Sequence, residues 1–96
     1  MAIIVSEDRY SKIELDLNGP DGNAFCVIGT AVNVAKQIGY STEELKEFRT
    51  KCMSQSYGKT LVDVDRLFGD FIDLKMTSSY MRSIDDSSFK LYFLKQ

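Results

Sequence analysis

The 96-residue chain contains no histidine and no tryptophan. Without histidine it lacks the base of Ser-His-Asp and Cys-His nucleophilic catalysis and the most frequent general acid and base. It also lacks a common protein ligand of zinc and iron. We therefore expect a protein that is not an enzyme and that has no catalytic residue, metal or cofactor.

The chain also has only two cysteines, a small net charge and no long apolar run. Cys26 and Cys52 form no Cys-x-x-Cys pair, and we expect two reduced thiols. The net charge of −2 argues against a nucleic-acid partner bound through its phosphates. The first residues show no targeting pattern, and no stretch reaches the length that crosses a membrane. These features favour a cytoplasmic protein without a membrane partner.

Length and hydrophobic pattern predict a single α+β domain over residues 1–96. Alternation predicts strands at 12–17 and 71–76, and helical spacing predicts helices at 24–38, 42–53 and 59–68. The aromatic, β-prone segment 89–95 predicts a third strand, and the Ser- and Asp-rich segment 77–88 predicts a loop before it. The order β-α-α-α-β-β indicates a small antiparallel or mixed sheet of about three strands, with three helices packed on one face. Residues 3–5 are a candidate for a short additional strand.

Local signals define the ends of the predicted helices. Gly39 fits the residue that follows a helix, while Ser41 and Glu44 fit a capping box for the next one. The helix at 24–38 is apolar nearly all round, which predicts burial on several sides. Gly29 lies inside this helix at a cost of roughly 1 kcal/mol relative to Ala, which a close backbone contact there would offset. Cys26 is interpreted as a packing residue rather than a reactive thiol.

The densest group of turn-forming residues lies at 18–23, before the first helix. Backbone N–H groups at a helix start can hold a phosphate, so one interpretation is a nucleotide site. No Walker or Rossmann glycine pattern supports it, and Pro20 and Val27 stand where a calcium loop needs ligands. The pattern favours a strand-to-helix turn that needs its glycines. The candidate ligand-binding residues are Asn18, Gly19, Asp21, Gly22 and Asn23.

Acidic and aromatic residues supply candidate contacts for a partner protein. Four aspartates between 63 and 73 indicate a solvated helix face, or a patch that meets a basic partner through Asp63 and Asp70. The predicted strand 89–95 is apolar on both faces, so an exposed edge would invite pairing with another chain. Tyr80, Tyr92 and Leu94 are the candidate contacts in the last part of the chain.

The segment 13–25, IELDLNGPDGNAF, resembles a family of small uncharacterised bacteriophage and prophage proteins. Their shared features are a Gly-Pro-x-Gly-Asn-Ala-Phe turn, an apolar helix and a later Phe-Gly-Asp-aromatic step, which is 68–71 in this chain. The resemblance covers about 12–74, and 75–96 looks like an extension. It implies a phage accessory gene, a class that often encodes small binders of host proteins.

Three functions follow as expectations. The leading one is a phage-encoded accessory protein that binds, inhibits or sequesters a host or defence-system protein. The first alternative is a nucleotide binder or sponge that uses the turn at 18–23. The second is a structural or assembly protein that works as a homo-oligomer.

Overall fold

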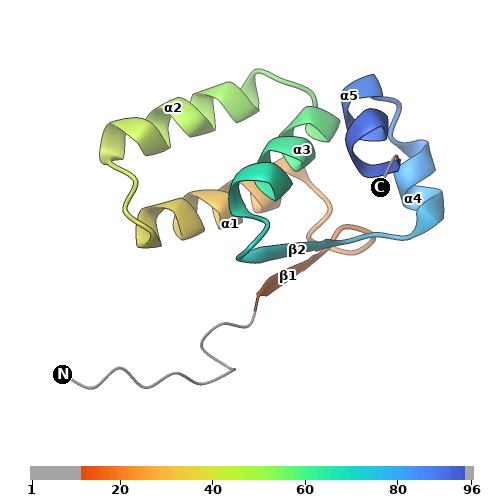
Figure 1. Cartoon of the computed structure of the whole chain (residues 1–96), viewed down its shortest axis with the longest axis horizontal. Helices are drawn as coiled ribbons and strands as arrows, with labels where there is room; N and C mark the ends of the chain where they lie inside the picture. Colours follow the sequence, from red (N-terminus) through yellow and green to blue (C-terminus); the bar gives the residue numbers. More distant parts are fainter. Residues whose placement is uncertain (1–11, 95–96) are drawn as a thin grey trace.

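The structure is a computed structural model that describes residues 12–94. Strands β1 (Ile13–Asp16) and β2 (Ile72–Lys75) form a two-stranded parallel sheet with Ile13 opposite Ile72. The helices lie on one side of this sheet (Figure 1). The predicted α+β class is confirmed, but three strands and an antiparallel pairing are wrong for the described residues. The candidate strand at 3–5 lies outside them.

Three helices follow β1 and separate it from β2. They are α1 (Ala24–Gln37), α2 (Thr42–Met53) and α3 (Tyr57–Phe68), close to their predicted bounds. Asn23 accepts a hydrogen bond from the Cys26 N–H at the start of α1, and Ser41 and Glu44 form the expected capping box of α2. Gly39 has a φ of 109°, as its position after a helix requires. Local capping signals therefore predict this part of the fold correctly.

The core lies between the helices and the inner face of the sheet. α1 contributes the largest share of it, from Val27 to Ala35, and the Phe68 ring packs against the rings of Phe48 and Tyr40 at centroid distances of 5.6 and 5.7 Å. α1 packs against both α2 and α3, but burial nearly all round is wrong, because Phe25 is 74% exposed. The close contact that would offset the cost of Gly29 is not found, because a Cβ there would meet nothing within 4 Å.

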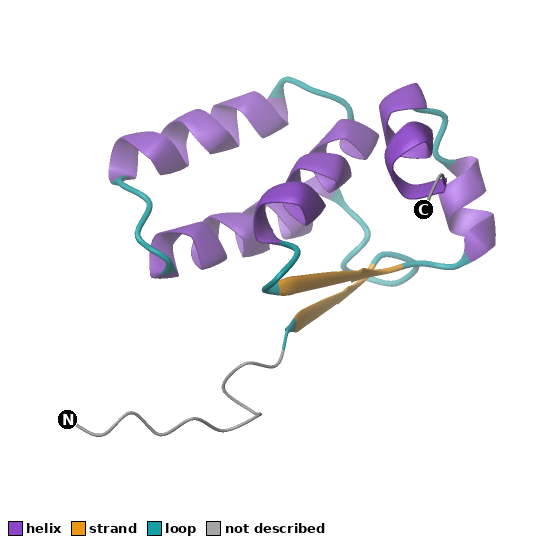
Figure 2. Cartoon of the chain, in the orientation of Figure 1, coloured by secondary structure: helices purple, strands orange, loops and turns teal. Residues whose placement is uncertain are grey.

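The last part of the described chain is helical. α4 (Ser78–Ser83), α5 (Ser87–Phe89) and a π-helical turn (Lys90–Leu94) replace the predicted loop at 77–88 and strand at 89–95 (Figure 2). The Phe89 side chain is fully buried, and its ring lies 4.7 Å from that of Phe93. Apolar residues four apart share one side of a helix, so the segment packs one side inward and leaves Leu91 and Leu94 exposed. This packing is the physical reason for the correction.

Candidate functional site

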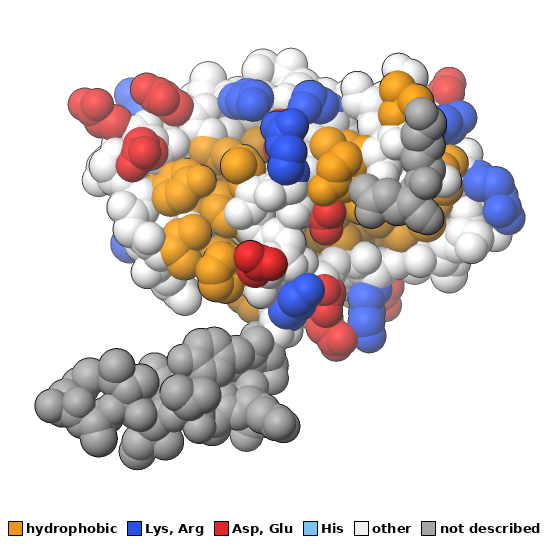
Figure 3. Space-filling model, viewed as in Figure 1, with side chains coloured by type: hydrophobic (Ala, Val, Ile, Leu, Met, Phe, Trp, Pro, Cys, Tyr) orange, Lys and Arg blue, Asp and Glu red, His pale blue; other side chains and the backbone are white. Residues whose placement is uncertain are grey.

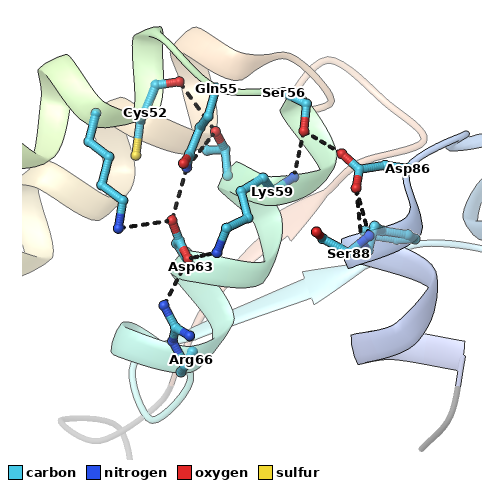
Figure 4. Close-up of polar contacts among 11 residues, drawn as sticks. Cys52, Gln55, Ser56, Lys59, Asp63, Arg66, Asp86 and Ser88 are labelled. Carbon is cyan, nitrogen blue, oxygen red and sulfur yellow. Dashed lines mark hydrogen bonds and ion pairs between the residues drawn. The ribbon is translucent and has the colours of Figure 1, made fainter.

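A buried carboxylate with three cations around it lies where α2 meets α3. Asp63 is 1% exposed. Its Oδ1 accepts from Lys59 Nζ at 2.9 Å and from Arg66 Nη2 at 3.0 Å (Figure 4). Its Oδ2 accepts from Gln55 Nε2 at 2.9 Å and pairs with Lys51 Nζ at 3.6 Å. We call Lys51, Lys59 and Arg66 the cation cluster.

The local sequence explains how the cation cluster forms. Lys59 and Arg66 precede and follow Asp63 on α3 at i,i+4 and i,i+3 spacing, which places all three side chains on one side of the helix. Lys51 reaches the same carboxylate from the last turn of α2. Helical spacing therefore brings two cations to Asp63, and the turn of the chain between α2 and α3 brings the third.

The electrostatics of the site favour an ionised aspartate. Burial raises the pKa of a carboxyl group. Hydrogen bonds from Lys59 and Gln55 and the charges of Lys51 and Lys59 outweigh that effect, so the pKa of Asp63 is lowered. One carboxylate shared by three cations leaves two positive charges unmatched within the cluster. This surplus stands out in a chain whose net charge is −2.

The cation cluster reaches the surface although Asp63 does not. The Lys51 and Arg66 side chains are 59% and 55% exposed. Lys and Arg side chains gather near the middle of the face shown in Figure 3, with hydrophobic side chains on both sides of them. Lysine and arginine carry several N–H donors each. Donors therefore remain for a molecule that docks on this face.

Exposed apolar side chains lie beside the cation cluster, where α1 and α3 both end. The two helix ends meet through Tyr40 and Phe68. Ile38, Leu67 and Phe71 are between 43% and 47% exposed and form what we call the apolar end. Leu67 directly follows Arg66 on α3, and hydrophobic side chains lie next to the Lys and Arg side chains on the face shown in Figure 3.

The turn at 18–23 has structural roles for its polar groups. The Asn23 side chain caps α1 and donates to the Pro20 carbonyl. Asp21 accepts from the Asp16 N–H and from the Cys26 thiol. Burial and then the Asp21 contact raise the pKa of that thiol, which disfavours a reactive thiolate.

Close backbone contact explains why residue 22 of this turn is glycine. A Cβ at Gly22 would collide with the Leu17 carbonyl oxygen. The N–H groups of Gly19, Gly22 and Asn23 already donate to nearby backbone carbonyl groups, those of Asp16, Gly19 and Asp21. Because these donors are engaged, an anion could use them only after rearrangement of the turn. The nucleotide site at 18–23 stays a prediction.

The five residues predicted to meet a partner occupy different environments. Asp63 is buried in the cation cluster, so the expectation of a solvated face is wrong for it. Asp70 and Leu94 are exposed. The Tyr80 hydroxyl donates to that of Tyr57 at 3.3 Å, and the Tyr92 hydroxyl donates to Asp65 at 2.8 Å. Within residues 12–94, no hydrogen bond or ion pair joins one of the five to another.

Sequence reasoning missed the cation cluster itself. The spacing of Lys59, Asp63 and Arg66 was a usable signal, since oppositely charged residues three and four apart pair on a helix. Lys51 had no such signal, because its approach depends on how the short link at 54–56 turns the chain between α2 and α3.

Two kinds of feature are absent from the described residues. Across 12–94, no three His, Cys, Asp or Glu side chains are grouped so that they could hold a metal ion. No helix in that range has the length and apolarity needed to cross a membrane. No protein-family model matches the chain, and neither a curated protein nor a solved structure matches it.

Proposed function

We propose that the chain acts by binding another protein rather than by catalysis. The observation that supports this proposal is the exposed cation cluster together with the exposed side chains of the apolar end; Figure 3 shows hydrophobic side chains next to Lys and Arg side chains on one face. Protein interfaces combine a desolvated apolar centre with a polar rim and are enriched in arginine. Leu67 and Arg66 supply neighbouring residues of both kinds.

The biological setting is proposed from the sequence resemblance. Residues 13–25 resemble small phage and prophage proteins, and accessory genes of that kind often encode binders of host proteins. We therefore propose an accessory protein of a bacteriophage that inhibits or sequesters a host or defence-system protein.

The test uses the full chain immobilised and exposed to bacterial host lysate. We expect a partner to be retained in a fixed stoichiometry and to be lost with the double variant Leu67→Asp, Phe71→Asp. The matched control is Leu91→Asp, which changes a side chain that is 60% exposed at the other end of the molecule. Equal retention by the wild type and the double variant would contradict the proposal.

Two further measurements separate the alternatives. Light scattering of the purified chain that shows a dimer, lost in the double variant, would assign the apolar end to self-association instead. Turnover of nucleotide, peptide or ester substrates by the purified chain would overturn the assignment as a non-enzymatic binder.

A further inference from the structure

We propose that Lys51, Lys59 and Arg66 bind the carboxylates of an acidic segment on the partner protein. In this arrangement Asp63 is the internal residue that holds the three cations together. The inference rests on the proposed function and names the chemistry of the partner. It makes the cation cluster the charged part of the contact and the apolar end its hydrophobic part.

The first argument is that the cluster is preorganised. Three cationic groups repel one another, yet all three approach the Asp63 carboxylate within 3.6 Å. The carboxylate also accepts from Gln55, which fixes its orientation from the loop after α2. A partner carboxylate would therefore meet cations that are already gathered, and less conformational entropy would be lost on binding.

The second argument is that suitable donors remain at the surface. Arg66 bonds Asp63 through Nη2, and its planar guanidinium has further N–H groups that can hold a second carboxylate. The Lys51 contact of 3.6 Å is longer than that of Lys59, and the Lys51 side chain is 59% exposed. Both side chains can thus serve a partner without release of Asp63.

The third argument concerns the negative groups around the cluster. Asp65 accepts from the Tyr92 hydroxyl, and Asp86 accepts from the Ser56 hydroxyl. Exposed Asp70 follows the end of α3. Asp86 contacts the Ser56 cap at the start of α3, next to Lys59, so its negative charge limits how far a polyanion could extend in that direction.

The same charges favour an acidic protein segment over nucleic acid. Nucleic-acid binding draws on a broad basic surface, whereas this cluster has three cations in a chain of net charge −2. The apolar end lies directly beside it. A segment that carries both acidic and apolar side chains matches the two parts together.

The experiment titrates the isotope-labelled full chain with a short helical peptide of Glu and Leu, followed by amide chemical shifts. We expect shifts around Lys51, Lys59, Arg66 and Leu67, and weaker binding at higher salt. The double variant Lys51→Ala, Arg66→Ala should weaken binding about tenfold or more, as expected for loss of charge-assisted hydrogen bonds. The matched control is Lys46→Ala, Arg49→Ala, which removes two exposed cations elsewhere on α2 and should change the affinity less than about twofold.

Titrations with other ligands distinguish between classes of ligand. A peptide with Gln in place of Glu should lose most of the binding, and equal binding would overturn the inference. Tighter binding of inorganic phosphate or of single-stranded DNA at the same residues would also overturn it. Thermal unfolding of each variant verifies that it is folded before titration.

The inference and the proposed function fail in different ways. If a lysate partner is lost with Leu67→Asp, Phe71→Asp but kept by Lys51→Ala, Arg66→Ala, the inference fails and the proposed function stands. If the Glu peptide binds as expected and no protein partner is retained, the proposed function fails while the carboxylate site remains.

Discussion

Two reciprocal hydrogen bonds join Asn18 and Thr77. Asn18 Nδ2 donates to Thr77 Oγ1 at 3.2 Å, and the Thr77 N–H donates to Asn18 Oδ1 at 2.9 Å. The same Thr77 oxygen accepts from the Tyr80 N–H and caps α4. The turn before α1 is thereby coupled to the start of the C-terminal helices.

Replacement of Asn18 by Ala should weaken both ends of this coupling. We expect the free energy of unfolding to fall by about 0.5–1.5 kcal/mol, because the exposed Thr77 groups exchange their side-chain partner for water. Amide hydrogen exchange at Tyr80 should also become faster. Asn33→Ala, at an exposed position of α1, serves as the control and should leave that exchange unchanged. Unaltered exchange in Asn18→Ala would show that the two segments are not coupled.

Replacement of Asp63 by Asn keeps the side-chain shape and removes its charge. We expect the free energy of unfolding at neutral pH to fall by about 1–3 kcal/mol, since charge-assisted hydrogen bonds from Lys59 and Arg66 are lost. Urea unfolding measures this change. Asp70→Asn, at an exposed position, should stay within about 0.5 kcal/mol of the wild type. Equal effects of the two substitutions would contradict a special role of Asp63.

The stability difference between the wild type and Asp63→Asn should depend on pH. The pKa of Asp63 is lowered in the folded chain, so the group contributes stability above its unfolded pKa. That contribution disappears as the pH falls through the folded pKa. We expect a constant difference at neutral pH that shrinks below about pH 4, near the unfolded value for aspartate.

Urea unfolding of both proteins over this pH range provides the measurement. The pKa of Asp86 is also lowered, chiefly by the Ser56 hydroxyl, but this residue is present in both proteins and its effect cancels in the difference. A difference that stays constant into acid would show that the Asp63 charge does not contribute.

Two glycine substitutions should have opposite effects. A Cβ at Gly58 would lie 2.9 Å from the Asp86 side chain, which caps α5. Gly58→Ala should therefore lower the free energy of unfolding by about 1–3 kcal/mol. Gly29→Ala lies inside α1 with open space around it and should raise that free energy by about 0.5–1 kcal/mol. Thermal unfolding compares them, and a stable Gly58→Ala would show that Asp86 can move away freely.

Truncation of Phe89 tests whether the C-terminal helices are part of the core. The side chain is fully buried, so Phe89→Ala should cost about 3–5 kcal/mol. Leu91→Ala, at a side chain that is 60% exposed, should cost about 0.5 kcal/mol or less. Urea unfolding separates the two cases. Similar small effects would mean that the last helices pack only loosely.

Local signals predicted the middle of the chain and missed its end. Asn23, Ser41 and Glu44 act on backbone groups within a few residues, so the helix starts can be read directly from the sequence. The hydrophobic pattern of the segment that contains Phe89 and Phe93 is compatible with either a strand or a helix. Packing against the rest of the fold decides between them, and the sequence pattern does not contain that information.

The same distinction applies to the candidate site. Lys59 and Arg66 surround Asp63 through spacing on one helix, which was visible in the sequence. Contacts between residues far apart in the sequence determine the other features. These are the approach of Lys51, the parallel pairing of β1 with β2 and the position of the apolar end. The charged centre was therefore partly predictable, but its position beside an apolar surface was not.

The parallel pairing of β1 and β2 also has a kinetic consequence. α1, α2 and α3 all lie between the two strands in the sequence, so the sheet can form only when this whole segment has its ends together. Closure of a long loop loses conformational entropy before the strand contacts can stabilise the chain, and non-local pairing therefore slows folding. We therefore expect the helices to form early and the Ile13–Ile72 register to be set late. The sheet would then mark the completion of folding rather than its nucleus.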